Sequence, residues 1–116
     1  MDVEQMRTIL VGVLNWTLCE YWPDGPMVYR NSDGDFVMWQ KDWRPDEKPE
    51  QIMMVVDSLD KDWFLHVWIN EGGQSWTCEA AHGDFKEFGF GKFCEAICMA
   101  IAGVRKLEEV TDKTTR

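Results

Sequence analysis

The residues best suited to metal binding or nucleophilic catalysis in this 116-residue chain are four cysteines and two histidines. Cys94 and Cys98 are four residues apart and would share one face of a helix. Further candidate ligands are Cys78, His66 and His82. Structural zinc requires two closely spaced ligand pairs, and this sequence offers only one. We therefore expect no metal site and no cofactor, and we interpret the cysteines as small buried hydrophobic side chains.

Cys94 is the best candidate nucleophile, because a reactive thiolate needs a positive environment and Lys92 lies two residues away. Glu95, directly beside it, opposes that effect. The sequence contains no G-x-S-x-G motif, no glycine-rich phosphate loop and no H-E-x-x-H motif. We expect the chain not to be an enzyme, with a small thiol-dependent enzyme as the less favoured alternative.

Negative charge is the most informative feature of the composition. Asp and Glu total 21 against 12 Lys and Arg, which gives a formal net charge of -9. This excess disfavours direct binding to nucleic acid and to anionic membranes. Eight of the acids and four of the bases fall within residues 20–50. Such an array could present carboxylates where a nucleic-acid-binding protein expects phosphates, or it could simply aid solubility.

Two tryptophans lie among these carboxylates. Aromatic anchors with polar surroundings are typical of protein-binding hot spots. We therefore predict a partner-binding set, formed by Asp24, Asp33, Asp35, Trp39, Trp22 and Asp42. Trp43 is also close to these carboxylates, and it could serve either as a surface anchor or as a residue packed under the following helix. Trp68 and Trp76 are expected to lie in the core.

Apolar periodicity predicts three helices, at residues 2–18, 49–60 and 92–107. Alternation and turn residues predict strands between them, at Met27–Tyr29, Phe36–Gln40, Phe64–Asn70, Ser75–Ala81 and Phe85–Phe90. The Asp-Gly step within residues 31–35 favours a hairpin turn over the calcium loop that it faintly resembles. Strand 64–70 is apolar on both faces, which predicts a central strand covered on both sides.

The order of these elements is helix, two strands, helix, two or three strands, helix. It predicts an α+β fold, in which three helices cover a mainly antiparallel sheet as a layered sandwich. Residues 1–107 would form a single domain, and residues 108–116 a polar, frayed tail. The expected core includes Val55, Leu65, Val67, Ile69, Ile97 and Ile101. No apolar run approaches membrane-spanning length and the N-terminus is acidic, so a cytoplasmic location is expected.

Several short motifs resemble a known family. Trp43-Arg44-Pro45 gives a W-x-P link, and Gln51, Val55 and Leu59 follow in a Q-x-x-x-V-x-x-x-L pattern. The other matching features are Asn15-Trp16-Thr17 after the first helix, Trp63 and Trp76 as hairpin aromatics, and the Ala-Ile-x-x-Ala run at Ala96–Ala100. Together they resemble the small phage-encoded proteins of the phage ABA sandwich domain family. Segment 21–40 departs from that pattern, because it is longer and more acidic.

The resemblance implies an ABA sandwich fold and a phage origin. A small acidic phage protein in the host cytosol is expected to bind and inhibit a host protein with a basic surface. The most plausible target is an antiviral defence component, so the expected role is anti-CRISPR-like. The alternative is an accessory, structural or regulatory phage protein without a defence target.

Overall fold

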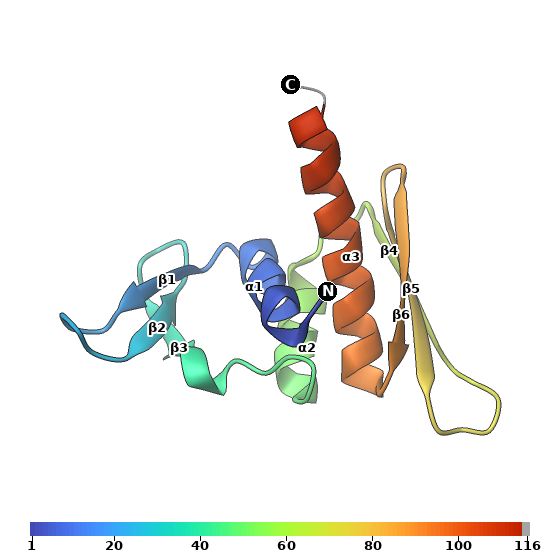
Figure 1. The fold of residues 1–116 in the computed structure, drawn as a ribbon, viewed down its shortest axis with the longest axis horizontal. Helices are drawn as coiled ribbons and strands as arrows, with labels where there is room; N and C mark the ends of the chain where they lie inside the picture. The colour runs from blue at the N-terminus through green and yellow to red at the C-terminus, as the bar shows by residue number, and fades with distance from the viewer. Residues whose placement is uncertain (115–116) are drawn as a thin grey trace.

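Three α-helices lie between two three-stranded antiparallel sheets in the computed structural model, which describes residues 1–114 of the chain (Figure 1). The helices are α1 (Val3–Val13), α2 (Pro49–Ser58) and α3 (Phe93–Thr114), with a 3-10 turn η1 (Gln40–Asp42). The small sheet contains β1 (Thr17–Glu20), β2 (Met27–Arg30) and β3 (Phe36–Trp39). The second sheet contains β4 (Trp63–Ile69), β5 (Trp76–His82) and β6 (Phe85–Gly91). The α+β class with antiparallel hairpins is thus confirmed.

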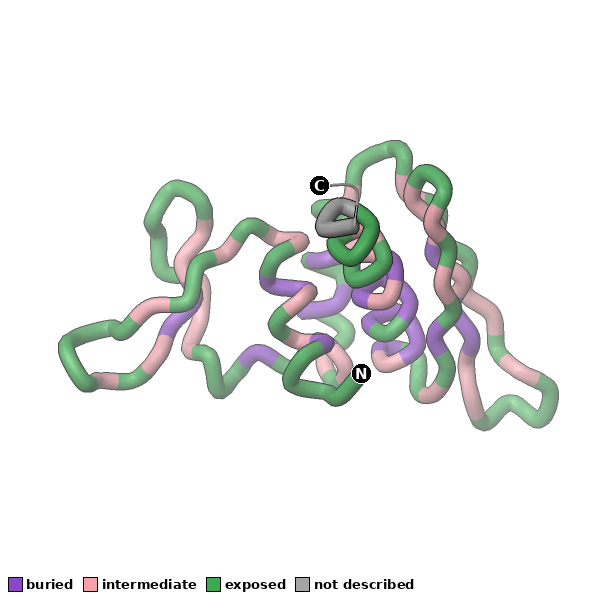
Figure 2. The backbone as a smooth tube through the Cα atoms, turned by 45° about the horizontal axis from the view of Figure 1, so that its top comes forward, coloured by how far each residue is buried: buried purple, intermediate pink, exposed green. Residues whose placement is uncertain are grey.

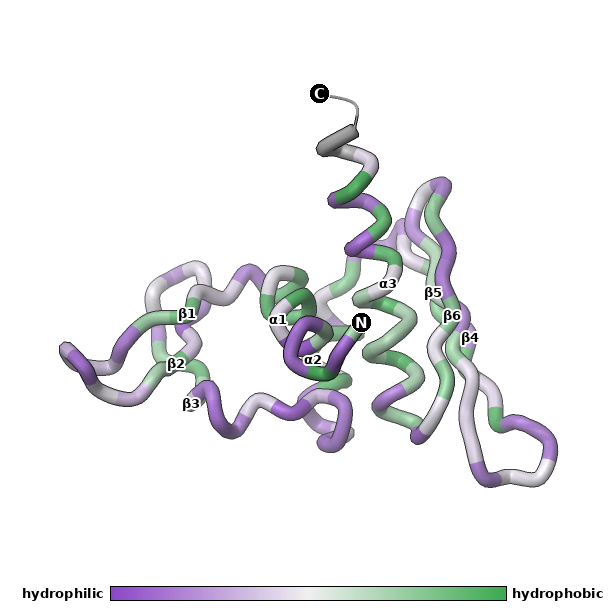
Figure 3. Tube along the Cα trace, in the orientation of Figure 1, coloured by the Kyte–Doolittle hydropathy of each residue, from purple (hydrophilic) through white to green (hydrophobic). Residues whose placement is uncertain are grey.

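Helix α3 forms the centre of the hydrophobic core. One side of it packs on β5 and β6, and the other packs against α1 and α2. Figure 2 shows most of the buried residues on these helices, and Figure 3 shows that α3 is apolar along most of its first half. Ala96 and Ala100 are fully buried where the helix crosses Gly89 of β6. Small side chains on both elements allow this close approach.

Helix α1 ends at Val13, five residues before the end of the predicted helix 2–18. Asn15 adopts a left-handed conformation with φ 59°. Its N–H donates to the Gly12 carbonyl, and the Trp16 N–H donates to the Val11 carbonyl at 3.2 Å. These are the two bonds of a Schellman motif, which terminates a helix. The prediction of helix through residue 18 was therefore wrong, and residues 17–20 form β1 instead.

Strand β4 is an edge strand, since the order of its sheet is β4-β5-β6. The prediction that it is central and covered on both faces was wrong, because α1 and α2 pack on α3 rather than on the second face of the sheet. Phe64 is exposed, and Trp68 lies on the open face rather than in the core. Trp76 packs at the core edge against Phe93.

Half of the predicted core set is fully confirmed. Val55, Ile97 and Ile101 are buried. Leu65 and Val67 are partly buried and pack against the core, whereas Ile69 is 50% exposed and its assignment was wrong.

Helix α3 continues past Leu107, where the sequence analysis placed its end, as far as Thr114. Glu108, in the predicted tail, pairs with His82 of β5 at 3.2 Å and so holds the added turns against the sheet. Residues 115 and 116 lie outside the described part of the chain. Among residues 1–114, no helix has the length and apolar character needed to cross a bilayer.

Candidate protein-binding site

The small sheet is attached to the helices by three aromatic residues, which we call the aromatic seam: Trp16, Tyr29 and Trp43. The Trp16 and Trp43 ring centroids are 5.0 Å apart, and Tyr29 lies within 6.5 Å of both. The Trp43 indole N–H donates to the Arg7 carbonyl of α1 at 3.0 Å. Trp43 is only 2% exposed, so it is a core residue and not a surface anchor.

The opposite face of the small sheet carries four further aromatic side chains. Val28, fully buried, lies beneath them, and its register partners are Cys19 of β1 and Trp39 of β3. Tyr21 extends the β1–β2 pairing, because its N–H donates to the Pro26 carbonyl at 2.9 Å. We call the group Tyr21, Trp22, Phe36 and Trp39 the aromatic cluster.

A β-bulge brings Phe36 and Trp39 to the same face. Residues three apart in a regular strand point to opposite faces. The register of β2 and β3 shifts between Tyr29 and Arg30, whose partners are Met38 and Phe36, so that one residue of β3 is unpaired. The extra residue shifts the alternation of side chains by one position, so that Phe36 and Trp39 point to the same face. The Phe36 and Trp39 ring centroids are consequently 5.4 Å apart, in an edge-to-face arrangement.

Tyr21 joins the other members of the cluster. Its ring centroid lies 5.1 Å from Trp22, 5.1 Å from Trp39 and 6.2 Å from Phe36. Edge-to-face and tilted contacts at these distances are favourable beyond simple burial. Tyr21, Trp22 and Phe36 nevertheless remain exposed to solvent, with Trp22 at 54%. The cluster is therefore internally ordered and still presents apolar surface.

Gly25 holds the Trp22 ring in place. The Gly25 N–H donates to the Trp22 carbonyl at 2.7 Å, which closes a tight turn. A Cβ atom at position 25 would lie 2.5 Å from the indole ring. Trp22 thus folds back over its own turn, and any larger residue at position 25 would displace it.

The predicted carboxylates occupy the surroundings of this cluster. Asp24 lies in the β1–β2 turn, and Asp33 and Asp35 lie in the β2–β3 turn, so they flank the cluster at opposite ends of β2. Asn31 Oδ1 accepts from the backbone N–H groups of both Asp33 and Asp35 at 3.0 Å, which fixes the turn without using either carboxylate. Asp42 is exposed at the end of η1.

Residues 17–42 hold five acids and two bases, a local net charge of -3. None of these five carboxylates forms an ion pair within 4 Å with a side chain of residues 1–111. Their charge is therefore free to act on a partner.

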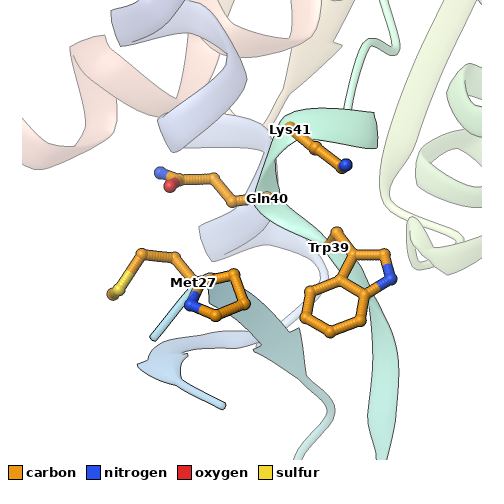
Figure 4. Close-up of a pocket in the computed structure, with 5 residues that line it drawn as sticks. Met27, Trp39, Gln40 and Lys41 are labelled. Carbon is orange, nitrogen blue, oxygen red and sulfur yellow. The ribbon is translucent and has the colours of Figure 1, made fainter. Parts of the chain in front are cut away.

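A hollow of about 310 Å³ adjoins the cluster on the side of Trp39. Its lining residues are Pro26, Met27, Trp39, Gln40 and Lys41. Figure 4 shows the Met27 and Trp39 side chains on opposite sides of it, with Gln40 and Lys41 above. One face of Trp39 is therefore accessible next to a space that can hold a side chain of a partner.

Of the four residues in the aromatic cluster, Trp22 and Trp39 were predicted from the sequence and Tyr21 and Phe36 were not. Tyr21 directly precedes Trp22, and Phe36 directly follows the acidic turn, so closeness in sequence to the predicted residues is a signal that could have identified both. The bulge that aligns Phe36 with Trp39 has no comparable sequence signal.

Three of the four cysteines, Cys78, Cys94 and Cys98, are buried. Burial, with Glu79 adding to it, raises the pKa of Cys78 to about 11. Burial also raises the pKa of Cys94 and, more strongly, that of Cys98. These shifts favour the neutral thiol, which is the weaker nucleophile.

His82 lies between two carboxylates, with Nδ1 3.2 Å from Glu108 and Nε2 3.7 Å from Asp60. Its ring stacks on Trp63 at 4.7 Å. Ser58 lines the adjoining hollow, but its hydroxyl donates to the Val55 carbonyl at 2.6 Å. The arrangement links α3 to β5 and directs no nucleophile toward His82. Residues 1–111, whose side chains the structure describes, include no group of three or more His, Cys, Asp or Glu side chains placed to hold a metal ion.

Comparison with protein families, with curated proteins and with solved structures found no match for this chain.

Proposed function

We propose that this chain is a non-enzymatic binding protein that docks its aromatic cluster onto a basic surface of a partner protein. The observation that carries this proposal is the contact of four aromatic rings on an exposed sheet face with unpaired carboxylates at both ends. The exposed part of this aromatic surface is not needed to attach the small sheet to the helices, because the aromatic seam attaches the sheet from its other face.

Charge and apolar surface would act at different stages of binding. The carboxylates of the two turns would attract a positive surface over a distance and raise the association rate. The rings of Trp22 and Trp39 would lose their remaining contact with water only in the docked complex, and would therefore set the dissociation rate.

Inhibition is the consequence of binding that best fits the resemblance to small phage proteins. Basic surfaces of antiviral defence proteins bind nucleic acid, and a folded acidic protein that covers such a surface would block it. We therefore propose an anti-defence role in the host cytosol, with an anti-CRISPR-like inhibitor as the specific form. The rigid turn at Asp33 and Asp35 would place carboxylates where phosphates otherwise bind.

The test uses quantitative capture from host lysate followed by binding kinetics with the captured protein. Trp22→Ala is expected to raise the dissociation rate by about tenfold or more, as for a hot-spot residue. The double change Asp33→Asn/Asp35→Asn is expected to slow association, and added salt should do the same. The control is Phe88→Ala, which removes an exposed aromatic ring of the other sheet, at 43% exposure.

Equal loss in the Phe88 control, or kinetics unchanged by the Trp22, Asp33 and Asp35 substitutions, would refute this assignment of the surface. Thermal unfolding of each variant, compared with the original chain, separates lost contacts from lost fold.

A further inference from the structure

Of the four sheet edges in residues 1–114, only β4 is both long and without Asp, Glu, Lys or Arg. The edge strands of the small sheet, β1 and β3, have four residues each. The β6 edge carries Lys86, Glu87 and two glycines, which are features that discourage pairing. Strand β4 has seven residues, Trp63 to Ile69, without Asp, Glu, Lys, Arg, Pro or Gly. Such an edge is a template for pairing with another strand.

The direction of the backbone groups on β4 follows from its pairing with β5. Asn70 N–H donates to the Ser75 carbonyl at 2.8 Å, just beyond the paired residues. Because hydrogen-bonded pairs alternate along an antiparallel ladder, Phe64, His66 and Trp68 direct their backbone groups to β5. Leu65, Val67 and Ile69 therefore direct theirs to the open edge.

The side chains of β4 that face α3 are also incompletely covered. Helix α3 packs mainly over β5 and β6. Leu65 and Val67 are only partly buried, and Ile69 is half exposed. An additional strand at this edge would satisfy the free backbone groups and bury these side chains at the same time.

We propose that β4 pairs antiparallel with β4 of a second copy of this chain, to give a six-stranded sheet with both α3 helices on one face. A two-fold axis perpendicular to the sheet places paired residues of the two copies on the same face. Because residues on one face of a strand are an even number of positions apart, the numbers of two paired residues must add to an even value. With the axis at His66, all seven residues pair: Leu65 with the partner's Val67, and Phe64 with the partner's Trp68. Aromatic cross-strand pairs of this kind are stabilising.

One pair of opposite charges fits the same register. Counting outward from the strand ends with His66 on the axis, Lys61 of each copy corresponds to Glu71 of the other, and Asp62 corresponds to the neutral Asn70. Lys61 and Glu71 are both exposed in the turns that flank β4, and neither forms an ion pair with a side chain of residues 1–111. Shifting the axis to Leu65 or Val67 shortens the pairing and removes this match. The aromatic cluster is on the other sheet, so the pairing is independent of the proposed function.

Sedimentation velocity over a range of protein concentrations, at low salt, tests the proposal. The original chain should show a dimer that dissociates on dilution. Lys61→Glu and Glu71→Lys each create two like-charge contacts across the axis and should raise the dimer Kd by about tenfold. The double variant Lys61→Glu/Glu71→Lys exchanges the charges and should restore the original Kd.

Ile69→Lys, which adds two buried charges to the joined edge, should leave only monomer. A chain that is monomeric at several hundred micromolar would overturn the proposal. A dimer whose Kd is unchanged by both single charge reversals and by Ile69→Lys would equally overturn it, because it would form through another surface. Lys86→Glu on β6 is the matched control and should leave the Kd unchanged.

Discussion

Adding a single methyl group at Gly89 is expected to destabilise the chain by about 3 kcal/mol. The substitution Gly89→Ala places a Cβ atom 2.8 Å from the Ala100 backbone nitrogen, 2.9 Å from the Ala96 carbonyl carbon and closer still to the Ala96 carbonyl oxygen. Carbon atoms pack at about 3.5 to 4.0 Å, so α3 would have to move from β6 by about 0.7 Å or more. All the clashing atoms are backbone, and no side-chain rotation can relieve them.

The cost comes from the contacts that this movement opens. Helix α3 packs on β5 and β6 through buried small residues such as Ala96 and Ala100, so a uniform gap weakens the whole interface. Interiors packed as densely as organic crystals transmit such strain, which places the loss at the upper end of the usual range for overpacking. For a chain of this size, we expect the melting temperature to fall by about 10 °C or more.

Two further glycine substitutions serve as controls in the same thermal and urea unfolding assays. Gly103→Ala lies in the same interface, but the nearest atoms to its Cβ would be Cβ and Cγ of Glu87, both at 3.1 Å, so the overlap is milder than at Gly89 and should cost less. Gly12→Ala lies in α1 with no atom within 4 Å, and should stabilise the chain by up to about 1 kcal/mol. If Gly89→Ala cost no more than Gly103→Ala, the close approach of α3 to β6 described above would be incorrect.

Three other outcomes are expected. Ile97→Ala should cost about 2 to 5 kcal/mol in urea unfolding, because the side chain is buried, and a loss under about 0.5 kcal/mol would show that α3 is not docked as described. Burial opposes the charge of Asp46, but the hydrogen bonds from Arg7, at 2.7 Å and 3.1 Å, lower its pKa overall. A lowered pKa in the folded state contributes stability at neutral pH, and this contribution is lost as the pH falls below the ordinary carboxyl pKa of about 4. In Asp46→Asn, the free energy of unfolding should therefore depend less on pH in the acid range. An unchanged dependence would contradict this. In the folded chain at pH 8, iodoacetamide should modify the half-exposed Cys19 well before Cys78, whose pKa is about 11, and mass spectrometry of the labelled peptides would reveal the opposite order.

Turn and cap chemistry made much of this fold predictable. The Asp-Gly step at residues 33–34 gave the β2–β3 turn, and Gly34 indeed has a φ of 85°. Pro49 marked the start of α2 at the residue where the helix begins. These signals are local, because they depend on the conformational preferences of one or two residues.

The wrong predictions concern features that depend on contacts between distant parts of the chain. A strand that is apolar on both faces is expected to be buried on both, but the sequence does not show which elements would pack on each face. In β4, α3 packs on only part of one face, and Phe64 and Trp68 lie on the other face, which no helix covers. The end of α1 was missed because Asn15, although tolerant of positive φ, is a weaker stop signal than glycine.

The sequence predicted two members of the aromatic cluster, but not how the aromatic rings come into contact. Trp22 and Trp39 were chosen because they are close in sequence to carboxylates, and the structure shows that Tyr21 joins their rings. That contact depends on the hairpin register and on the bulge of β3, neither of which follows from residue types alone. Trp43 is equally close in sequence to carboxylates, but it is buried, and its indole N–H donates a hydrogen bond to the Arg7 carbonyl of α1.

The aromatic seam has a consequence for how this protein can evolve. It holds one face of the small sheet to the helices, while the aromatic cluster occupies the other face. Figure 1 shows the small sheet set to one side of the three helices. Free-energy changes at well-separated sites are close to additive, so substitutions at Trp22 or in the two acidic turns should leave the stability of the α3 core nearly untouched. Selection could therefore change the surface that the small sheet presents to solvent without compensating mutations in the rest of the fold.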